Sequence, residues 1–475
     1  MSSQLFKKAV SFHQSGDVQR AIKSYSEFLK LEPNHLQANC LKASALQASN
    51  RHTEAIAHYL IAHQESPNDP AITLEIALCF SKIGNLDRSN FFYEKTIALN
   101  PHDARAWTNL GNNLTKLKLY KKAFLAYETA YNLEQQNAMI CYNIGTMFLE
   151  AMDPDSALPW LQRAVTLDPK YPAALNGLAV ALTELGDLNS AINFYETALR
   201  IEPVFVEPAF NLHMVCIDTG ELEKAISMLE KAIRLDPKNP VLKFFLAMTL
   251  TYTGNIDLSL KIFSQINAIK KIRGELDSWE FIQRVSPNLP KLTGTNFASI
   301  RYAMQAANLD GLILEFGVFN GKSIRRIAEF SSSDIYGFDS FEGIPEAWND
   351  ELSGSYSAEG VLPAVPKNVT LVKGWFNNSI PTFLNQLKTE SVIRFLHIDC
   401  DLYSSTKTIF DLLGKYIQPG TVILFDEFIG YKSWQKDEFK AFMEAAKMYS
   451  WGYEILLFSF ATKQVAVKIK SSSQK

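Results

Sequence analysis

The 475-residue sequence predicts an α-solenoid of helical hairpins followed by an α/β domain built on a mainly parallel sheet. Three observations predict this combination. A pattern of small, aromatic and proline residues recurs every 34 residues through the first half of the chain. From about residue 292 onward, short apolar runs alternate with helical segments instead. The last two apolar runs lie close together, which favours an antiparallel hairpin at the end of the sheet.

The repeat begins with a small residue that is followed four positions later by an aromatic or aliphatic one. The eight pairs are Ala21/Tyr25, Ala55/Tyr59, Ser89/Tyr93, Ala123/Tyr127, Ala157/Leu161, Ala191/Tyr195, Ala225/Leu229 and Ser259/Phe263. Proline follows twelve positions after the small residue in six units and ends the second helix, because it lacks the backbone N–H. Residues 2–270 are therefore expected to form about eight 34-residue hairpins, which stack because one hairpin cannot bury its apolar face alone.

This spacing resembles the tetratricopeptide repeat, and the resemblance implies a protein or peptide partner in the concave groove. Asn109, Asn143 and Asn211 share the sixth position of their repeats, and an amide can both donate to and accept from a peptide backbone. Other residue types hold this position in the remaining repeats. That variety favours the simpler interpretation, in which these asparagines solvate the groove wall.

Charge and cysteine content exclude several classes of protein. The formal charge is 47 − 50 = −3, so there is no positive surplus for binding nucleic acid. The five cysteines are scattered without a C-x-x-C pair, which argues against a disulfide framework and suits a reducing compartment. No apolar run reaches the roughly 18 residues of a membrane span, and the first thirty residues lack a signal-peptide core. The sequence predicts a cytoplasmic protein without a membrane span.

The 34-residue period stops after Ile269, where the basic run from Lys270 to Arg273 begins. Acidic residues flank this run, and Pro287 and Pro290 follow it. Residues 271–291 are therefore expected to form a linker with a solvated helix.

The second domain is expected over residues 292–470, with a helix from Thr295 to Asn308 and then seven strands. The predicted strands are Leu312–Phe316, Ile335–Phe338, Val369–Val372, Arg394–Ile398, Val422–Phe425, Glu454–Phe458 and Gln464–Ile469. Strands separated by helices indicate a sheet that is covered on both faces. Seven strands that end in a hairpin resemble a class I methyltransferase, which has a Rossmann-like fold, more than a dinucleotide dehydrogenase.

Ligands of open parallel sheets bind beyond the carboxyl ends of the strands, so the strand ends carry the candidate site. The first strand ends at Glu315, and Gly317 permits a tight turn with close approach of the backbone. Gly321 and Ser323 open the next helix, whose unpaired N–H groups favour an anionic group. Asp339 ends the second strand, where a carboxylate can accept both ribose hydroxyl protons of a nucleoside. Helix packing and loop capping are the structural alternatives for these residues.

Further candidates lie beside these strand ends. Ser340 follows Asp339, and Trp375 after the third strand can stack on an adenine ring or pack in the core. The connection over residues 344–366 is long, which favours a lid over the acceptor.

The fourth and fifth predicted strands end in carboxylates. Asp399 ends one strand, while Asp426 and Glu427 end its expected neighbour, so the three can converge and would repel one another unless a cation binds. Oxygen ligands favour a hard ion such as Mg²⁺. Capping of the following helix is the alternative, and it is preferred for Asp401. His397 shares a strand face with Asp399, and burial as a hydrogen-bonded histidine is favoured over a proton relay.

From about residue 292 to 469 the chain resembles the macrocin O-methyltransferase (TylF) family. The matching stretches are Glu315–Ser323, Asp339–Gly343, Lys373–Phe376 with Pro381, Asp399–Thr406 and Asp426–Glu427. The resemblance implies S-adenosylmethionine across the ends of the first two strands, a bound Mg²⁺ and a sugar hydroxyl as acceptor. It also implies that Asp399 is a metal ligand and the candidate general base, with Asp426 and Glu427 completing the metal site. The family usually has Asp-Asp where this chain has Asp426-Glu427.

The chemistry of methyl transfer requires such a site. A hydroxyl is a poor nucleophile until its proton is removed, and a general base contributes about 10²–10⁴-fold. The predicted function is a metal-assisted O-methyltransferase acting on a sugar or glycan hydroxyl, with the repeats recruiting a partner or polymeric substrate. One alternative is a nucleotide-sugar glycosyltransferase that uses Asp399 and Asp401 as a D-x-D motif, which leaves Asp339 unexplained. The other alternative is an interaction scaffold without catalysis.

Overall fold

The computed structural model describes residues 2–387 and 392–472. They form two compact units, which are described separately. The first unit holds the residues up to Ala151 together with Pro159–Pro169, and the second holds Met152–Leu158 together with the chain from Lys170 onward. Helix α10 (Pro154–Leu167) therefore contributes its first turn to the second unit and its remainder to the first.

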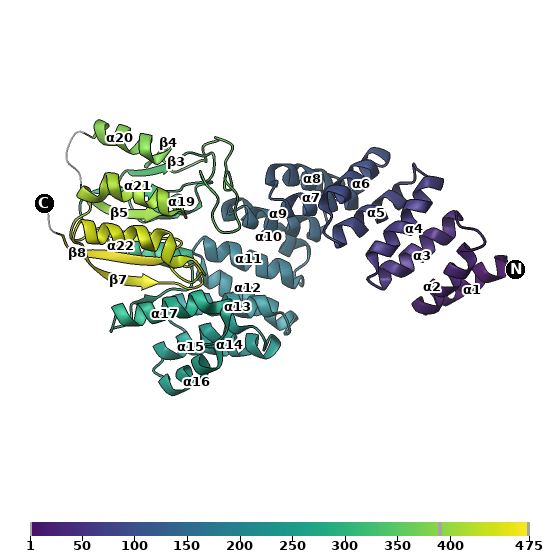
Figure 1. The fold of residues 1–475 in the computed structure, drawn as a ribbon, viewed down its shortest axis with the longest axis horizontal. Coiled ribbons are helices and arrows are strands. Elements are labelled where there is room, and N and C mark those ends of the chain that lie inside the picture. The colour runs from purple at the N-terminus through teal and green to yellow at the C-terminus, as the bar shows by residue number, and fades with distance from the viewer. Residues whose placement is uncertain (1, 388–391, 473–475) are drawn as a thin grey trace. The chain divides into compact units, whose positions relative to one another are not determined.

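Sixteen consecutive helices form eight helical pairs in the described part of the chain, with α9 and α10 joined through Gly145 and Leu161, which confirms the predicted solenoid (Figure 1). The first unit contains α1 (Ser2–Gln14), α2 (Val18–Leu29), α3 (Leu36–Ala48), α4 (His52–Glu65), α5 (Pro70–Lys82), α6 (Leu86–Leu99), α7 (Ala104–Lys116), α8 (Tyr120–Leu133), α9 (Ala138–Glu150) and most of α10. The second unit contains α11 (Pro172–Glu184), α12 (Leu188–Ile201), α13 (Val206–Thr219), α14 (Leu222–Leu235), α15 (Pro240–Tyr252) and α16 (Ile256–Ile266).

Close packing within each hairpin explains the repeated residue types. The small and large residues of the pattern are buried, as Ala123 and Tyr127 illustrate. A Cβ atom on Gly111 of α7 would lie 2.6 Å from the Tyr127 ring, so only glycine lets the two helices approach this closely. The large residue of the pattern is thus the contact that sets the helix spacing in this pair, and Leu161 makes the same contact with Gly145 in the next pair.

The turn between the two helices of each hairpin needs a left-handed residue. Glycine fills this position in five repeats, at Gly16, Gly84, Gly186, Gly220 and Gly254, all with positive φ. In the other three repeats Asn50, Lys118 and Met152 adopt φ of 57° to 58° at the same register position. The backbone geometry of the repeat is therefore kept even where the residue type that favours it is missing.

The sheet has eight described strands in the order β1-β7-β8-β6-β5-β2-β3-β4. Their bounds are β1 (Lys291–Leu292), β2 (Leu312–Phe316), β3 (Ile335–Asp339), β4 (Val369–Lys373), β5 (Ile393–Ile398), β6 (Val422–Phe425), β7 (Gly452–Phe458) and β8 (Val465–Ser471). All neighbours pair in parallel except β8, which is antiparallel to β6 and β7. The seven predicted strands and the terminal hairpin are confirmed, and β1 is an eighth, two-residue strand that the sequence did not predict.

Helices cover both faces of this sheet. On one face Ile313, Phe395 and Leu424 pack with the apolar side of α18 (Asn296–Ala306) and α19 (Lys322–Glu329). On the other face the ring of Phe316 contacts Phe376 of α20 (Phe376–Gln386). There, Phe425 contacts aromatic rings of α21 (Tyr403–Leu413) and α22 (Glu438–Met448). The strand ends between these layers carry the candidate site.

The segment expected as a linker is ordered into helix α17 (Arg273–Val285), which follows a short 3₁₀ turn at Lys270–Ile272. Its expected solvation differs from the structure, because Leu276, Trp279 and Ile282 are buried. The Trp279 ring lies 5.9 Å from the Phe458 ring at the end of β7. The apolar residues of this helix lie on one side and pack against the sheet domain. The charged residues at the start of the helix made this apolar side hard to recognise in the sequence.

Within the second unit, the last repeats pack directly against the sheet domain. The Phe244 ring of α15 meets the Phe460 ring edge-on at 4.9 Å, and the backbone N–H of Gly294 donates to Asp218 Oδ1 at 2.7 Å. The ring of Phe297 in α18 lies against Gly186, where a side chain would leave it no room. Helices α11–α16 and the sheet therefore belong to one compact unit.

Candidate active site

A cavity of about 520 Å³ opens at the carboxyl ends of β2, β3, β5 and β6. Its lining includes eight of the residues predicted from the sequence, namely Gly317, Ser323, Asp339, Ser340, Trp375, Asp399, Asp426 and Glu427. Glu315 and Gly321 lie outside this lining and act on it through their neighbours. The strand ends that were expected to converge thus face one cavity.

Position 317 must be glycine because the end of strand β5 lies directly against it. Its φ is +93°, and a Cβ atom there would collide with the backbone carbonyl oxygen of Asp399. The same crossing is tied by a hydrogen bond from the Asp399 N–H to the Phe316 carbonyl at 2.8 Å. Gly317 therefore brings the end of β2 against the end of β5, so that the turn and the carboxylate share one cavity.

Asp339 fixes the turn that follows β2. Its Oδ2 accepts from the backbone N–H groups of Val318 and Phe319 at 2.8 and 2.7 Å, and its Oδ1 accepts from Phe341 at 2.6 Å. A carboxylate has about four acceptor positions, so the residue keeps capacity for a ribose hydroxyl. The structure adds a positioning role to the predicted binding role.

Gly321 adopts φ of +84° at the N-cap of α19, and its N–H donates to the Val318 carbonyl at 2.7 Å. Ser323 and Lys322 then lie in the first turn of α19 and line the cavity. The helix begins at the cavity, as the sequence predicts for a turn that receives an anionic ligand group.

Glu315 is fully buried and pairs with His397 on the neighbouring strand. The two residues are register partners in β2 and β5, and His397 Nδ1 lies 2.8 Å from Glu315 Oε1. Glu315 therefore orients the imidazole rather than lining the cavity. Its predicted role in binding the cofactor stays a prediction.

His397, Asp399 and Asp426 form a compact group of potential metal ligands. One ligand atom from each lies within 4.8 Å of the others, and His397 Nε2 is 3.8 Å from Asp426 Oδ1. His397 Nε2 is buried without a hydrogen-bond partner among the described residues. An orphaned buried nitrogen beside two carboxylates fits a divalent cation with one imidazole and two oxygen ligands. This mixed donor set suits Mn²⁺ or Fe²⁺ as well as Mg²⁺.

Glu427, the third predicted ligand, has a different partner. Its Oε1 lies 3.0 Å from Lys463 Nζ, and its backbone N–H donates to Glu438 Oε2 at 3.2 Å. It lines the same cavity as Asp426, although it is outside the group of three. Its role as a metal ligand stays a prediction.

The electrostatics of the cavity favour a bound cation. Burial, and next the charge of Asp426, raise the pKa of Asp399 well above its usual range. Burial raises the pKa of Glu427 to about 8 and that of Asp401 to about 7. Burial alone would lower the pKa of His397, but the neighbouring Asp426 carboxylate and the hydrogen-bonded Glu315 hold it well above the usual value. Among the described residues, the positive groups beside these carboxylates are the His397 imidazolium, Lys322 and Lys463.

The sequence missed several residues of the site. Asp401 was expected to cap α21, and this prediction is wrong because the helix has Leu402 at its N-cap without a side-chain hydrogen bond. Asp401 instead adopts φ of 61° and lines the cavity. Lys322, Asn296 and Met152 also line it, and Lys322 Nζ is held by Glu184 Oε2 at 2.7 Å. In the sequence, Lys322 and Asn296 are recognisable only as polar residues at the starts of helices. No sequence pattern pointed to Met152.

The long connection after β3 forms one wall of the cavity. Ile344, Pro345, Trp348 and Tyr356 line it, and backbone hydrogen bonds of 2.9 Å tie Ile344 to Gly354 and Ser355. A lid function for residues 344–366 stays a prediction, although their place beside the cavity agrees with it.

Comparisons with known families identify both halves of the chain. A family described as "Methyltransferase domain" matches residues 314–428. Tetratricopeptide families match residues 12–168, described as the N-terminal repeat region of Psidin, and also 148–211 and 210–239. The chain therefore carries tetratricopeptide repeats followed by a methyltransferase domain.

Curated relatives match only part of the chain. Protein O-mannosyl-transferase TMTC3 of Homo sapiens is 25% identical over 180 residues, which cover 34% of this chain and 20% of that protein. The Hsp70-Hsp90 organizing protein of Triticum aestivum is 24% identical over 139 residues, covering 28% of this chain and 24% of that one. The chain thus spans about a fifth to a quarter of the length of these relatives.

Among solved structures, the tetratricopeptide protein YrrB is 26% identical, with a TM-score of 0.34, over 42% of this chain and 98% of that chain. The anaphase-promoting complex subunits Cut9–Hcn1 give 18% identity and a TM-score of 0.43 over 59% and 55%. In the part of the chain that the structure describes, no helix is both long and apolar enough to cross a membrane.

Proposed function

We propose that this protein transfers a methyl group from S-adenosylmethionine to a hydroxyl of a sugar or glycan, assisted by a divalent cation. The observation that carries the proposal is the meeting of Asp399 and Asp426 with His397 Nε2 in the cavity that Gly317 and Asp339 also line. The methyltransferase domain match over residues 314–428 supports the reaction class. Amine methylation needs no metal, so the acidic group favours oxygen as the acceptor atom.

The proposed cofactor region lies along the ends of β2 and β3. S-adenosylmethionine would supply the activated methyl group. Gly317 and Ser323 would line its binding surface, Asp339 would accept from its ribose, and the half-exposed Trp375 would stack on its adenine ring. Glu315 and Gly321 would support this region from behind, through His397 and the start of α19.

The proposed acid–base region lies along the ends of β5 and β6. Asp399 and Asp426 would hold the cation with His397, Glu427 standing next to them, and the cation would lower the pKa of the acceptor hydroxyl. Asp399 is the general base proposed from the sequence. Asp401, which lines the same cavity two residues later, is a second candidate for accepting the hydroxyl proton.

The acceptor is proposed to lie against the wall formed by residues 344–366. Trp348 and Tyr356 offer aromatic faces, and Asp401 and Ser404 offer acceptors for hydroxyl groups. Apolar faces beside convergent polar groups suit a sugar ring. The repeats are proposed to bring the partner or polymer that carries this acceptor, and the chain is proposed to work in the cytoplasm.

The substitution Asp399→Asn tests the catalytic assignment. It should lower methyl transfer to a panel of glycans by more than about a hundredfold, because it removes both a ligand and a base. Binding of S-adenosylmethionine, measured by calorimetry, should stay within about threefold because the cofactor region does not use this carboxylate. Labelled methyl donor and mass spectrometry, with and without a chelator, give the readout. Unchanged transfer by Asp399→Asn, or transfer that resists the chelator, would contradict the metal assignment.

One observation favours a second candidate function. Asp399 and Asp401 both face the cavity, as a metal-dependent glycosyltransferase with a D-x-D motif would require. Calorimetric titration with nucleoside diphosphate sugars in the presence of Mn²⁺ separates the two functions. Binding of such a sugar without binding of S-adenosylmethionine would favour glycosyl transfer, and binding of neither would favour an interaction scaffold.

A further inference from the structure

We propose that Asp155, a residue of the repeats, is a positioning residue for the cofactor region and acts through Arg325. The proposal rests on the proposed methyltransferase function and extends it, because it makes the fifth repeat a working part of the site. The residues involved all belong to the second compact unit.

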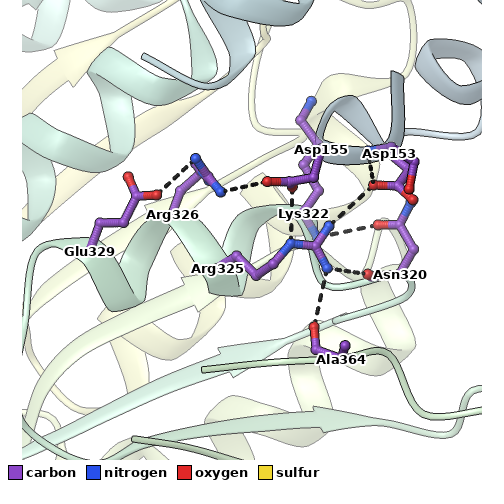
Figure 2. Close-up of polar contacts among 9 residues, drawn as sticks. Asp153, Asp155, Asn320, Lys322, Arg325, Arg326, Glu329 and Ala364 are labelled. Carbon is purple, nitrogen blue, oxygen red and sulfur yellow. Dashed lines mark hydrogen bonds and ion pairs between the residues drawn. The ribbon is translucent and has the colours of Figure 1, made fainter. Parts of the chain in front are cut away.

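The contact joins the first turn of α10 to helix α19, as Figure 2 shows. Arg325 Nε donates to Asp155 Oδ2 at 3.1 Å, and Arg325 Nη2 lies 3.6 Å from Asp153 Oδ1. Arg326 Nη2 donates to the other oxygen of Asp155 at 3.2 Å. One repeat carboxylate therefore holds two adjacent arginines of the helix that begins at the cavity.

Arg325 passes this restraint on to the walls of the cavity. Its Nη1 donates to the backbone carbonyl of Asn320 at 3.0 Å and to that of Ala364 at 3.3 Å (Figure 2). Asn320 belongs to the turn after β2 and lines the cavity. Ala364 belongs to the long connection of residues 344–366. The guanidinium thus links the turn that contains Asn320 to the connection of residues 344–366. Asp155 sets the orientation of the guanidinium.

The geometry uses the planar fork of the guanidinium. Asp155 and Asp153 take the Nε and Nη2 side, which leaves Nη1 directed at the two carbonyls. The Arg325 side chain is 18% exposed and Asp155 is 41% exposed, so the guanidinium is shielded from solvent while its carboxylate partner is partly hydrated. Without Asp155 the guanidinium can rotate, and the turn and the connection lose their shared donor.

The same pattern extends along α19. Its basic residues are Lys322, Arg325 and Arg326, and each of them pairs with an acidic residue of the repeats. Lys322 pairs with Glu184 at the end of α11, and it lines the cavity itself. Met152, next to Asp153 in the turn before α10, also lines the cavity. The repeats therefore contribute to the site both by charge and by direct contact.

Calorimetric titration of the full chain with S-adenosylmethionine tests the proposal. Asp155→Asn should raise the dissociation constant about threefold to tenfold, because the cofactor must then order a turn that the ion pairs hold in place in the unmodified protein. Its melting temperature should fall by no more than about 3 °C. The KM for the cofactor should rise in the same proportion while kcat changes less than about threefold, because the group does not touch the reacting atoms.

Two variants serve as controls. Glu329→Gln removes the other partner of Arg326, at 2.8 Å on the same helix, and should leave cofactor affinity within about twofold. Asp155→Glu keeps the charge and should restore most of the affinity. Should Asp155→Asn fail to fold, Arg325→Lys provides the measurement, since lysine keeps the charge but cannot reach the carboxylate and both carbonyls together.

The outcomes separate the two proposals. If the unmodified protein binds no S-adenosylmethionine, both the proposed function and this inference are overturned. If the unmodified protein binds the cofactor and Asp155→Asn binds equally well, only the inference is overturned. A loss of affinity that Glu329→Gln reproduces would also overturn it, because the effect would then reflect the charge of α19 in general.

Discussion

The absence of a Cβ atom at Gly317 allows the end of β2 to lie against the end of β5. A side chain at this position would collide with the carbonyl of Asp399 and would also be strained by the positive φ. We expect Gly317→Ala to lower the free energy of unfolding by about 3 kcal/mol or more, because both strands must shift. Chemical denaturation of the full chain, followed by the fluorescence of tryptophan, measures this loss.

Gly354 provides the matched control for that substitution. It has φ of +86°, but a Cβ atom there would meet no other atom within 4 Å. Gly354→Ala should therefore cost only the backbone strain of about 1 kcal/mol. Equal losses for the two variants would show that the contact with Asp399 contributes nothing.

The sequence predicted the strand-end residues well because parallel strands place their carboxyl ends at one edge. It identified Asp399 and Asp426, which the structure brings together, from the spacing of strands alone. The role of Glu315 in cofactor binding stays a prediction from its position at a strand end, and the sequence did not predict its pairing with His397. A pair that forms across two strands, 82 positions apart in the chain, leaves no local pattern. The same holds for Lys322, whose partner Glu184 lies 138 positions earlier in the chain, at the end of α11.

At the scale of elements, the junction between α13 and the segment after β1 depends on one carboxyl group. Asp218 Oδ1 accepts from the Gly294 N–H, and burial raises the pKa of Asp218 to about 6. Because the folded state then binds more protons than the unfolded state between about pH 4 and 6, stability falls as the pH rises through this window. Above pH 6 the loss stays constant.

The substitution Asp218→Asn should remove this pH dependence, since the amide oxygen can still accept the hydrogen bond without carrying charge. We expect nearly equal free energies of unfolding at about pH 4 and an advantage for the variant of up to about 3 kcal/mol at pH 7. Urea denaturation at a series of pH values measures the difference. If the difference in free energy of unfolding between the variant and the unmodified protein is the same at every pH, the role assigned to this carboxyl group is contradicted.

Two elements show where prediction from the sequence ended. Strand β1 has two residues, too few for an alternating pattern, and its existence depends on pairing with β7 far along the chain. Helix α17 begins with charged residues, and its overall composition is polar. The burial of Trp279 and Ile282 could therefore not be predicted from composition. In contrast, the eight hairpins were predictable because each repeats the same pattern, and seven strands were predictable because each is a short, mostly apolar run bounded by turns.

For the whole molecule, the boundary between repeats and sheet domain in the sequence is not the boundary between compact units. A chain that begins at Met152 keeps the second unit whole, whereas one that begins at Lys271 loses the partners of Phe460, Phe297 and Gly294. We expect the longer chain to unfold cooperatively and to bind S-adenosylmethionine like the full protein. The shorter chain should aggregate, because it exposes an apolar face.

Size-exclusion chromatography and near-ultraviolet circular dichroism distinguish these outcomes. A monomeric, cooperatively folding chain from Lys271 would contradict the assignment of the last repeats to the core of the second unit. In that case the repeats would be an independent attachment, and the roles of Glu184 and Asp155 would require another explanation.

The division inside α10 also bears on how related chains can vary in length. Hairpins of the first unit that end before Ala138 contact their neighbours, so duplication or deletion of a whole 34-residue unit there keeps every local interface. The same event between Lys170 and Ile266 would move Glu184, Gly186 and Asp218 out of register with the sheet domain. We therefore expect related chains to gain or lose whole repeats before Ala138, where such a change leaves the contacts between the last repeats and the sheet domain unaltered.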